Sequence, residues 1–130
     1  MSALFVAVGG AAGSLLRYWM SGAAQRSVPA TGAWSVFPLG TLTVNVLGCL
    51  LAGALAEWGA RHGPLSAETR ALLMVGFLGG FTTFSAFANE TVAVWRSGAA
   101  PVAAVNVVVS VVVCFAAVAA GRGLVAMAVR

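Results

Sequence analysis

Asn45 is a polar side chain inside an otherwise apolar stretch, residues 37–58. A side-chain amide costs free energy in an apolar environment unless its hydrogen bonds are made. It can therefore serve as a hydrogen bond between helices. Alternatively, its NH₂ group offers two donors to an anion. The residues alone leave both roles open.

Phe84 and Phe87 are three residues apart, and this spacing places both rings on one face of a helix. They can be ordinary packing or lipid-facing aromatics. The alternative uses the positive edges of the rings, which can hold a small dehydrated anion without binding it tightly. Ion conduction needs weak binding of this kind. The hydroxyls of Thr82, Thr83 and Ser85 add hydrogen-bond donors beside the rings.

Three polar or polarisable side chains recur every fourth residue in the last apolar segment: Asn106, Ser110 and Cys114. This spacing forms a single stripe along a helix. The stripe is typical of a pore wall and also of a helix–helix interface, and the two interpretations are compatible.

Gly79 and Gly80 precede Thr82 and Thr83 in the middle of the third apolar segment. Two glycines followed by two β-branched residues weaken a helix. We expect a break between Gly79 and Thr82, caused by the glycines. Carbonyls released there can ligate a hard cation such as Na⁺, and a local distortion without a ligand is the alternative. Because no acid lies at the break, a complete shell would need carbonyls from two chains.

Two charged residues stand near span ends. Arg17, close to the end of the first apolar segment, can be a snorkelling interfacial anchor or a charge that draws anions into a vestibule. Glu90 lies about one turn beyond Phe87 and can be a proton-coupling group or a vestibule residue. Because Trp95 marks the end of this segment, we prefer the placement of Glu90 near the membrane interface.

The elements that carry these residues follow from composition. Of the 130 residues, 61% are hydrophobic and only 8% are charged, whereas about a quarter of a soluble domain is charged. The sequence therefore predicts an all-α membrane protein. Residues 1–130 would form a single four-helix transmembrane domain, with spans at about 3–20, 37–58, 69–95 and 102–121. The tryptophans fall near the predicted span ends, as interfacial aromatics do.

Several function classes are excluded by what the sequence lacks. His62 is the only histidine, and no nucleophile–base pair, phosphate-binding loop or metal-ligand cluster is present, so we expect no catalytic residues and no enzyme activity. The arginines are dispersed, and this pattern does not indicate nucleic-acid binding.

The distribution of arginines also bears on orientation in the membrane. Four spans place both termini on one side, with Arg61, Arg70, Arg122 and Arg130. Arg26 and Arg96 lie on the other side, with Arg17 near it. Such a small bias allows insertion in both orientations and head-to-tail pairing of two chains, or a single orientation that the bias is just enough to set.

Three stretches together resemble a known family: GFLGGFTTFSAFANE at Gly76–Glu90, GTLTVNVLG at Gly40–Gly48 and GGAAGSLLRY at Gly9–Tyr18. They are similar to the Fluc (CrcB) fluoride channels in order and size over the whole chain. The resemblance implies a small protein of the bacterial inner membrane that forms antiparallel, dual-topology homodimers. Each dimer would have two fluoride pores and a Na⁺ at its centre.

The resemblance also implies roles for individual residues. Phe84 and Phe87 would contact fluoride, and Asn45 would be the pore amide. Gly79 and Thr82 would supply carbonyls for Na⁺, Thr83 and Ser110 would line the pore, and Arg17 would be the vestibule arginine. The family's fourth span is usually rich in hydroxyls, whereas here Ser110 is flanked by Asn106 and Cys114.

The expected function is passive, selective export of fluoride through an antiparallel dimer embedded in membrane lipid. The alternative is a small proton-coupled multidrug exporter, also with four spans. Such exporters depend on an acid in the first span, and the first span here has none. A third possibility is a structural helix bundle, but a helix break and a polar stripe both cost stability without serving such a bundle.

Overall fold

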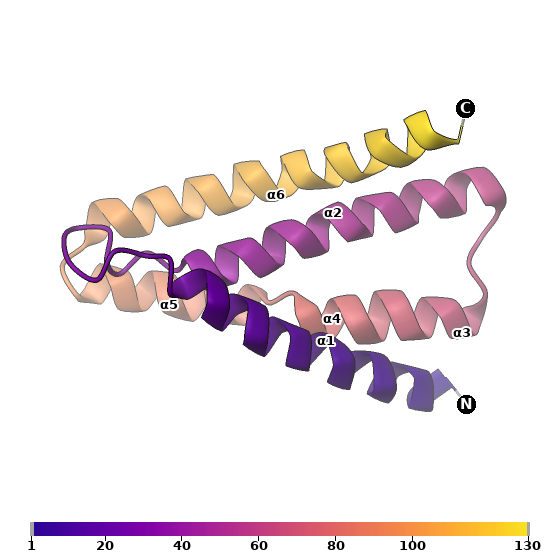
Figure 1. The fold of residues 1–130 in the computed structure, drawn as a ribbon, viewed down its shortest axis with the longest axis horizontal. Coiled ribbons are helices and arrows are strands. Elements are labelled where there is room, and N and C mark those ends of the chain that lie inside the picture. The colour runs from indigo at the N-terminus through magenta and orange to yellow at the C-terminus, as the bar shows by residue number, and fades with distance from the viewer. Residues whose placement is uncertain (1, 130) are drawn as a thin grey trace.

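The computed structural model describes residues 2–129, so Arg130, counted above among the basic residues, lies outside the described residues. Four helical segments are long and apolar enough to cross a membrane. Figure 1 shows that successive segments run in opposite directions and that both ends of the chain lie at the same end of the bundle. The prediction of an all-helical chain with four long apolar helices is confirmed. The segments are α1 (Ser2–Gln25), α2 (Leu39–His62), the third segment Ala67–Arg96, and α6 (Ala100–Ala128).

The helices extend beyond the predicted apolar spans. α1 continues to Gln25, although the first predicted span ended at about residue 20, because the alanines and the glutamine of this stretch favour a helix. The Gln25 side chain also joins α1 to the start of α2. Its Nε2 donates to the Phe37 carbonyl at 3.0 Å, and its Oε1 accepts from the Gly40 N–H at 2.9 Å. Gln25 thereby satisfies an N–H of the first turn of α2, whose N-cap residue, Pro38, makes no side-chain hydrogen bond to that turn.

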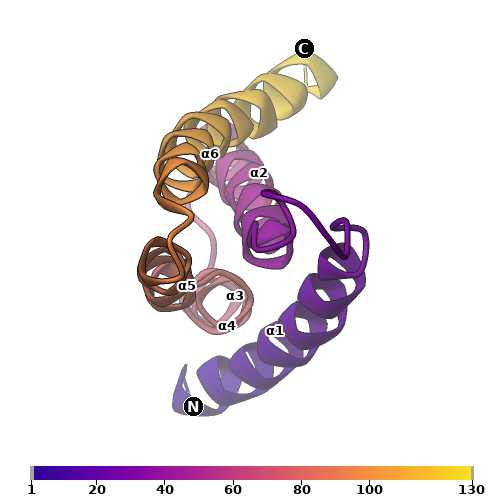
Figure 2. The ribbon, with the colours of Figure 1, turned by 90° about the vertical axis from the view of Figure 1, so that its left-hand side faces the viewer.

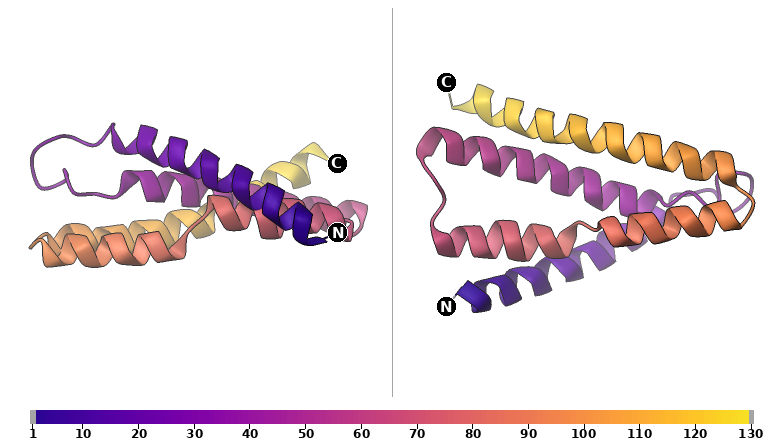
Figure 3. Two further views of the ribbon diagram at one scale, coloured as in Figure 1. Left: turned by 90° about the horizontal axis from the view of Figure 1, so that it is seen from below. Right: turned by 180° about the vertical axis from the view of Figure 1, so that it is seen from behind.

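The third segment is interrupted, as predicted, at the C-terminal end of the expected range. It consists of α3 (Ala67–Arg70), the π-helix η1 (Ala71–Leu78), the short α4 (Gly79–Phe81) and α5 (Phe84–Arg96). The backbone is extended at Thr82 and Thr83, between α4 and α5 (Figure 3, right). The assignment of the break to the glycines was wrong, since Gly79 is helical and α4 includes Gly80.

The glycines serve close packing instead. A Cβ atom on Gly9 or Gly13 would collide with the backbone of η1, at Leu72 and Phe77 respectively, and one on Gly80 would collide with the backbone of Gly10. α1 therefore lies directly against the first half of the third segment. Gly9 and Gly13, spaced as small-x-x-x-small, form this close-contact face of α1.

α2 and α6 form a second close pair, and they run in the same direction (Figures 1 and 2). A Cβ atom on Gly53 would collide with the backbone of Val118, and one on Gly121 with that of Leu50. Near the C-terminal end of α2, Glu57 forms ion pairs with Arg61 at 2.8 Å and Arg122 at 3.7 Å. These contacts set the relative position of the two helices along their length.

Candidate functional site

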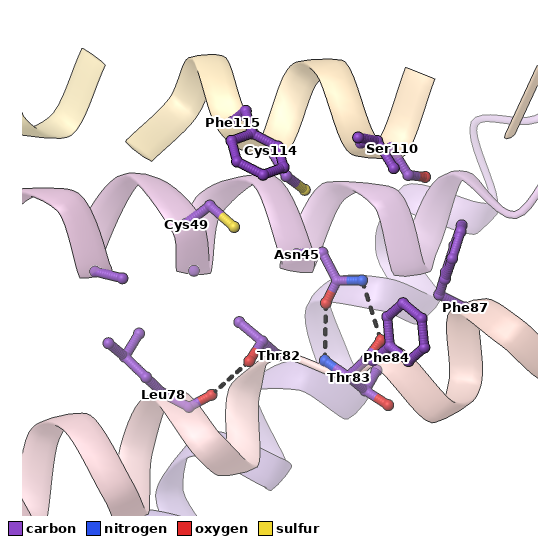
Figure 4. Close-up of a pocket in the computed structure, with 13 residues that line it drawn as sticks. Asn45, Cys49, Leu78, Thr82, Thr83, Phe84, Phe87, Ser110, Cys114 and Phe115 are labelled. Carbon is purple, nitrogen blue, oxygen red and sulfur yellow. Dashed lines mark hydrogen bonds between the residues drawn. The ribbon is translucent and has the colours of Figure 1, made fainter. Parts of the chain in front are cut away.

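The side-chain amide of Asn45, on α2, forms hydrogen bonds with both backbone groups of one residue in the interrupted segment, Thr83. Its Oδ1 accepts from the Thr83 N–H at 2.8 Å, and its Nδ2 donates to the Thr83 carbonyl at 3.1 Å (Figure 4). The extended conformation of Thr83 removes both groups from the helical hydrogen-bond pattern. The amide of Asn45 replaces the bonds that the helix loses, as backbone groups in a membrane require.

Threonine hydroxyls complete the two helix ends at the break. The Thr82 hydroxyl donates to the Leu78 carbonyl at 2.9 Å. The Thr83 hydroxyl caps α5, because its oxygen accepts from the Ala86 N–H at 3.1 Å, and it lies 3.2 Å from the Ser85 hydroxyl. Small residues with hydroxyl side chains therefore allow α5 to start anew inside a membrane span.

The break leaves the carbonyls of Gly79 and Thr82 without the amides that would bind them in a continuous helix. The amide of Thr83 donates to Asn45, and that of Ala86 donates to the Thr83 hydroxyl. The Cα of Gly79 faces open space, with no heavy atom within 4 Å of a Cβ built on it. Over residues 2–129, no three His, Cys, Asp or Glu side chains gather to hold a metal ion. Two released backbone carbonyls, one of them on Gly79 beside open space, are ligands of the kind that a hard monovalent cation takes.

A pocket of about 370 Å³ lies between α2, α6 and the interrupted segment. The rings of Phe84 and Phe87 stand at one side of it, with centroids 5.5 Å apart and planes inclined by 48°. Phe84 is 79% exposed, so one side of the pocket opens onto the molecular surface. The predicted residues that line it are Asn45, Thr82, Thr83, Phe84, Phe87 and Ser110, together with Cys49, Cys114 and Phe115 (Figure 4).

The polar stripe of α6 divides into two parts. Ser110 and Cys114 line the pocket, whereas Asn106 is only 1% exposed and lies outside it. Asn106 donates to the Thr91 hydroxyl oxygen at 2.7 Å and accepts from the Ser110 hydroxyl at 3.3 Å. Thr91, which the sequence analysis missed, in turn donates to the Phe87 carbonyl at 2.7 Å. A chain of hydrogen bonds thus connects Ser110 to the backbone of Phe87.

Arg17 and Glu90 lie apart from the pocket, in a neighbouring cavity of about 310 Å³. Thr83 lines both this cavity and the pocket. The Glu90 atom Oε2 is buried and has no hydrogen-bond partner among the described residues. The structure therefore brings the two predicted vestibule residues together on one side of Thr83 and the two phenylalanines on the other.

Comparisons with known proteins identify the family of the chain. Residues 4–122 match the family model described as CrcB-like protein, Camphor Resistance (CrcB). The chain is 48% identical over 127 residues to the fluoride-specific ion channel FluC of Rhizobium leguminosarum bv. trifolii (strain WSM2304), with 93% of each chain covered. It is 46% identical over 125 residues to FluC of Paracoccus denitrificans (strain Pd 1222), covering 93% of this chain and 94% of that one. The chain belongs to the CrcB-like protein family.

Proposed function

We propose that this chain is a fluoride-selective passive channel of the bacterial inner membrane and that it works as an antiparallel, dual-topology homodimer with two pores. The observation that carries the proposal is the pocket in which Asn45, Thr83 and Ser110 face Phe84 and Phe87. The names of the similar proteins, fluoride-specific ion channels, support the choice of ion. A channel performs no covalent chemistry, so the protein is not an enzyme.

The polar groups of the pocket have donors left for an anion. Asn45 uses one N–H on the Thr83 carbonyl, and its NH₂ group carries a second. The Thr83 oxygen accepts from Ala86, so its own proton is free for Ser85 or for fluoride. The positive ring edges of Phe84 and Phe87 contribute a weaker attraction. A small number of donors and weak ring contacts would let fluoride shed part of its water and still leave.

The neighbouring cavity provides a route of entry. Arg17 would draw anions into it, and Thr83 would receive them at the wall shared with the pocket. Glu90 would act there as a polar vestibule group. Asn106 would hold Ser110 and the Phe87 backbone in position through Thr91.

A second copy of the chain would complete each pore. Phe84 and Phe115 are 79% and 75% exposed at the pocket, so one chain supplies only part of a wall. The carbonyls of Gly79 and Thr82 from two copies would hold Na⁺ at the centre of the dimer. When bound, Na⁺ would offset the partial negative charge of these carbonyls and join the two chains.

Ion efflux from loaded liposomes tests the proposal. Fluoride should leave liposomes that contain the wild-type protein, while chloride stays inside. Phe84→Ile, which keeps an apolar side chain but removes the ring edge, should slow fluoride efflux by at least tenfold, equivalent to about 1.4 kcal/mol. Rapid chloride efflux, or an unchanged fluoride rate in Phe84→Ile, would contradict the proposal.

The alternative exporter has one structural feature in its favour, the buried and unpartnered oxygen of Glu90. α1 carries no acid on which such an exporter could depend. The exporter predicts a drug-driven proton flux that Glu90→Gln abolishes. If the protein is a channel, neither the wild type nor Glu90→Gln should show such a flux.

A further inference from the structure

The two cysteines of the chain stand opposite each other on neighbouring helices. Cys49 lies on α2 and Cys114 on α6, both are half-buried and unoxidised, and both line the pocket. Figure 4 shows both thiols directed into it. The proposed passage of fluoride needs neither thiol.

The packing of α2 against α6 holds the two thiols in register. Gly53 of α2 touches the backbone of Val118, and Glu57 pairs with Arg122. These α2 residues are one and two turns beyond Cys49, and their α6 partners are one and two turns beyond Cys114. Because successive pairs are separated by four residues on both parallel helices, Cys49 and Cys114 form the next level of the same ladder.

We propose that Cys49 and Cys114 form a two-coordinate binding site for a soft monovalent metal ion of the Cu(I) or Ag(I) class. Each thiol would lose its proton to solvent, and each sulfur would form one bond to the metal. Soft thiolate ligands select such ions. The described residues place no third His, Cys, Asp or Glu with them, so the site does not suit tetrahedral Zn²⁺.

Metal binding would also affect ion passage, and this part of the inference rests on the proposed function. Two thiolates and one monovalent cation carry a net negative charge. Asn45 and Ser110 lie one turn from the thiols, on the wall of the same pocket. A fixed negative charge there repels fluoride, so the metal should block the channel.

Silver ion is the probe for binding, added as the nitrate in chloride-free buffer to the full-length protein in detergent. The near-ultraviolet absorbance of the silver–thiolate bond reports occupancy. The wild type should bind one Ag⁺ per chain. Cys49→Ser and Cys114→Ser should each weaken binding by more than the roughly 100-fold that loss of an outer-shell partner costs a metal site.

A matched control keeps two thiols in the chain but separates them. In Val113→Cys/Cys114→Ser, one thiol moves by about 100° around α6. This variant should lose the single tight site. Two Ag⁺ per wild-type chain, or wild-type affinity in either serine variant or in the displaced pair, would overturn the proposal.

Fluoride efflux provides the second measurement, with each protein compared with its own rate before metal is added. Silver should inhibit the wild type and leave the relative rate of Cys49→Ser/Cys114→Ser unchanged. Tight binding without inhibition would overturn the block and would place the fluoride path away from this pocket. If the metal-free wild type conducts no fluoride, the proposed function fails, and the titration still decides the metal site.

Discussion

At the scale of single residues, Asn45 is the support of the helix break. It donates to and accepts from the backbone of Thr83, the residue at which two helices of one membrane span separate. Water normally satisfies such backbone groups, but the hydrocarbon of a membrane cannot. Asn45 therefore contributes to stability whether or not it also binds an anion.

Substitution of Asn45 tests this structural role. Asn45→Leu keeps the size of the side chain and leaves the N–H and C=O of Thr83 unpaired. Each unpaired group should cost about 1–3 kcal/mol of the free energy of unfolding. Denaturant titration in detergent, followed by tryptophan fluorescence, measures the change. Asn89→Leu on the exposed side of α5 is the control and should change the free energy by about 0.5 kcal/mol or less. Equal stability of the two variants would show that Asn45 does not support the break.

The sequence identified the candidate site residues by their chemical type, but it did not predict which residues they contact. Asn45, Phe84, Phe87 and Ser110 stood out because polar and aromatic side chains interrupt apolar segments, and the structure brings all four to one pocket. Asn106 stood out for the same reason, yet it bonds to Thr91 outside the pocket. Spacing along a helix predicts the face on which a side chain lies. The residue that it contacts depends on how the neighbouring helices are rotated about their axes.

At the scale of elements, glycines determine how closely the helices approach. α1 rests on η1 through Gly9 and Gly13, and α2 rests on α6 through Gly53 and Gly121. Without a hydrophobic driving force between helices in lipid, such close contacts supply much of the association energy. The pocket lies between the middle of α2, the middle of α6 and the broken segment.

Two glycines of α6 allow the effect of helix packing on stability to be distinguished from the effect of helix propensity. A Cβ atom on Gly121 would collide with the Leu50 backbone, whereas one on Gly123 would meet open space. Gly121→Ala should therefore destabilise the protein by about 1–3 kcal/mol through overpacking. Gly123→Ala should be neutral or stabilise it by up to about 1 kcal/mol, because alanine favours a helix. The same denaturant titration compares them, and a Gly121→Ala variant as stable as Gly123→Ala would contradict the close α2–α6 contact.

Hydropathy predicted the elements better than their ends or their interruption. Apolar runs identify what crosses the membrane. α1 and α6 continue past the predicted spans because most residues there, such as alanine, glutamine, leucine and arginine, favour a helix. The break was expected at glycines, since these weaken isolated helices. It lies at Thr82 and Thr83, where side chains replace the lost backbone bonds, and Gly80 remains helical because α1 packs against it.

At the scale of the whole molecule, the middle of the bundle leaves large aromatic side chains exposed. Phe84 and Phe115 are exposed beside the pocket, and Gly79, whose carbonyl is released by the break, faces open space. These features gather near the middle of the bundle rather than at its ends. Small or aromatic residues at mid-membrane are suited to contact with protein. A second copy related by a two-fold axis in the membrane plane would place the same mid-membrane residues opposite each other.

Cysteine crosslinking tests this arrangement. In the background Cys49→Ser/Cys114→Ser, Gly79→Cys should form a disulfide with the same residue of the second copy, because a residue near a two-fold axis meets itself. Gly123→Cys is the matched control, since its surroundings are equally open but it lies near one end of α6. In an antiparallel pair, the two copies of residue 123 lie at opposite membrane surfaces and should remain apart. Efficient crosslinking at residue 123, with none at residue 79, would instead require a parallel pair and a different pore.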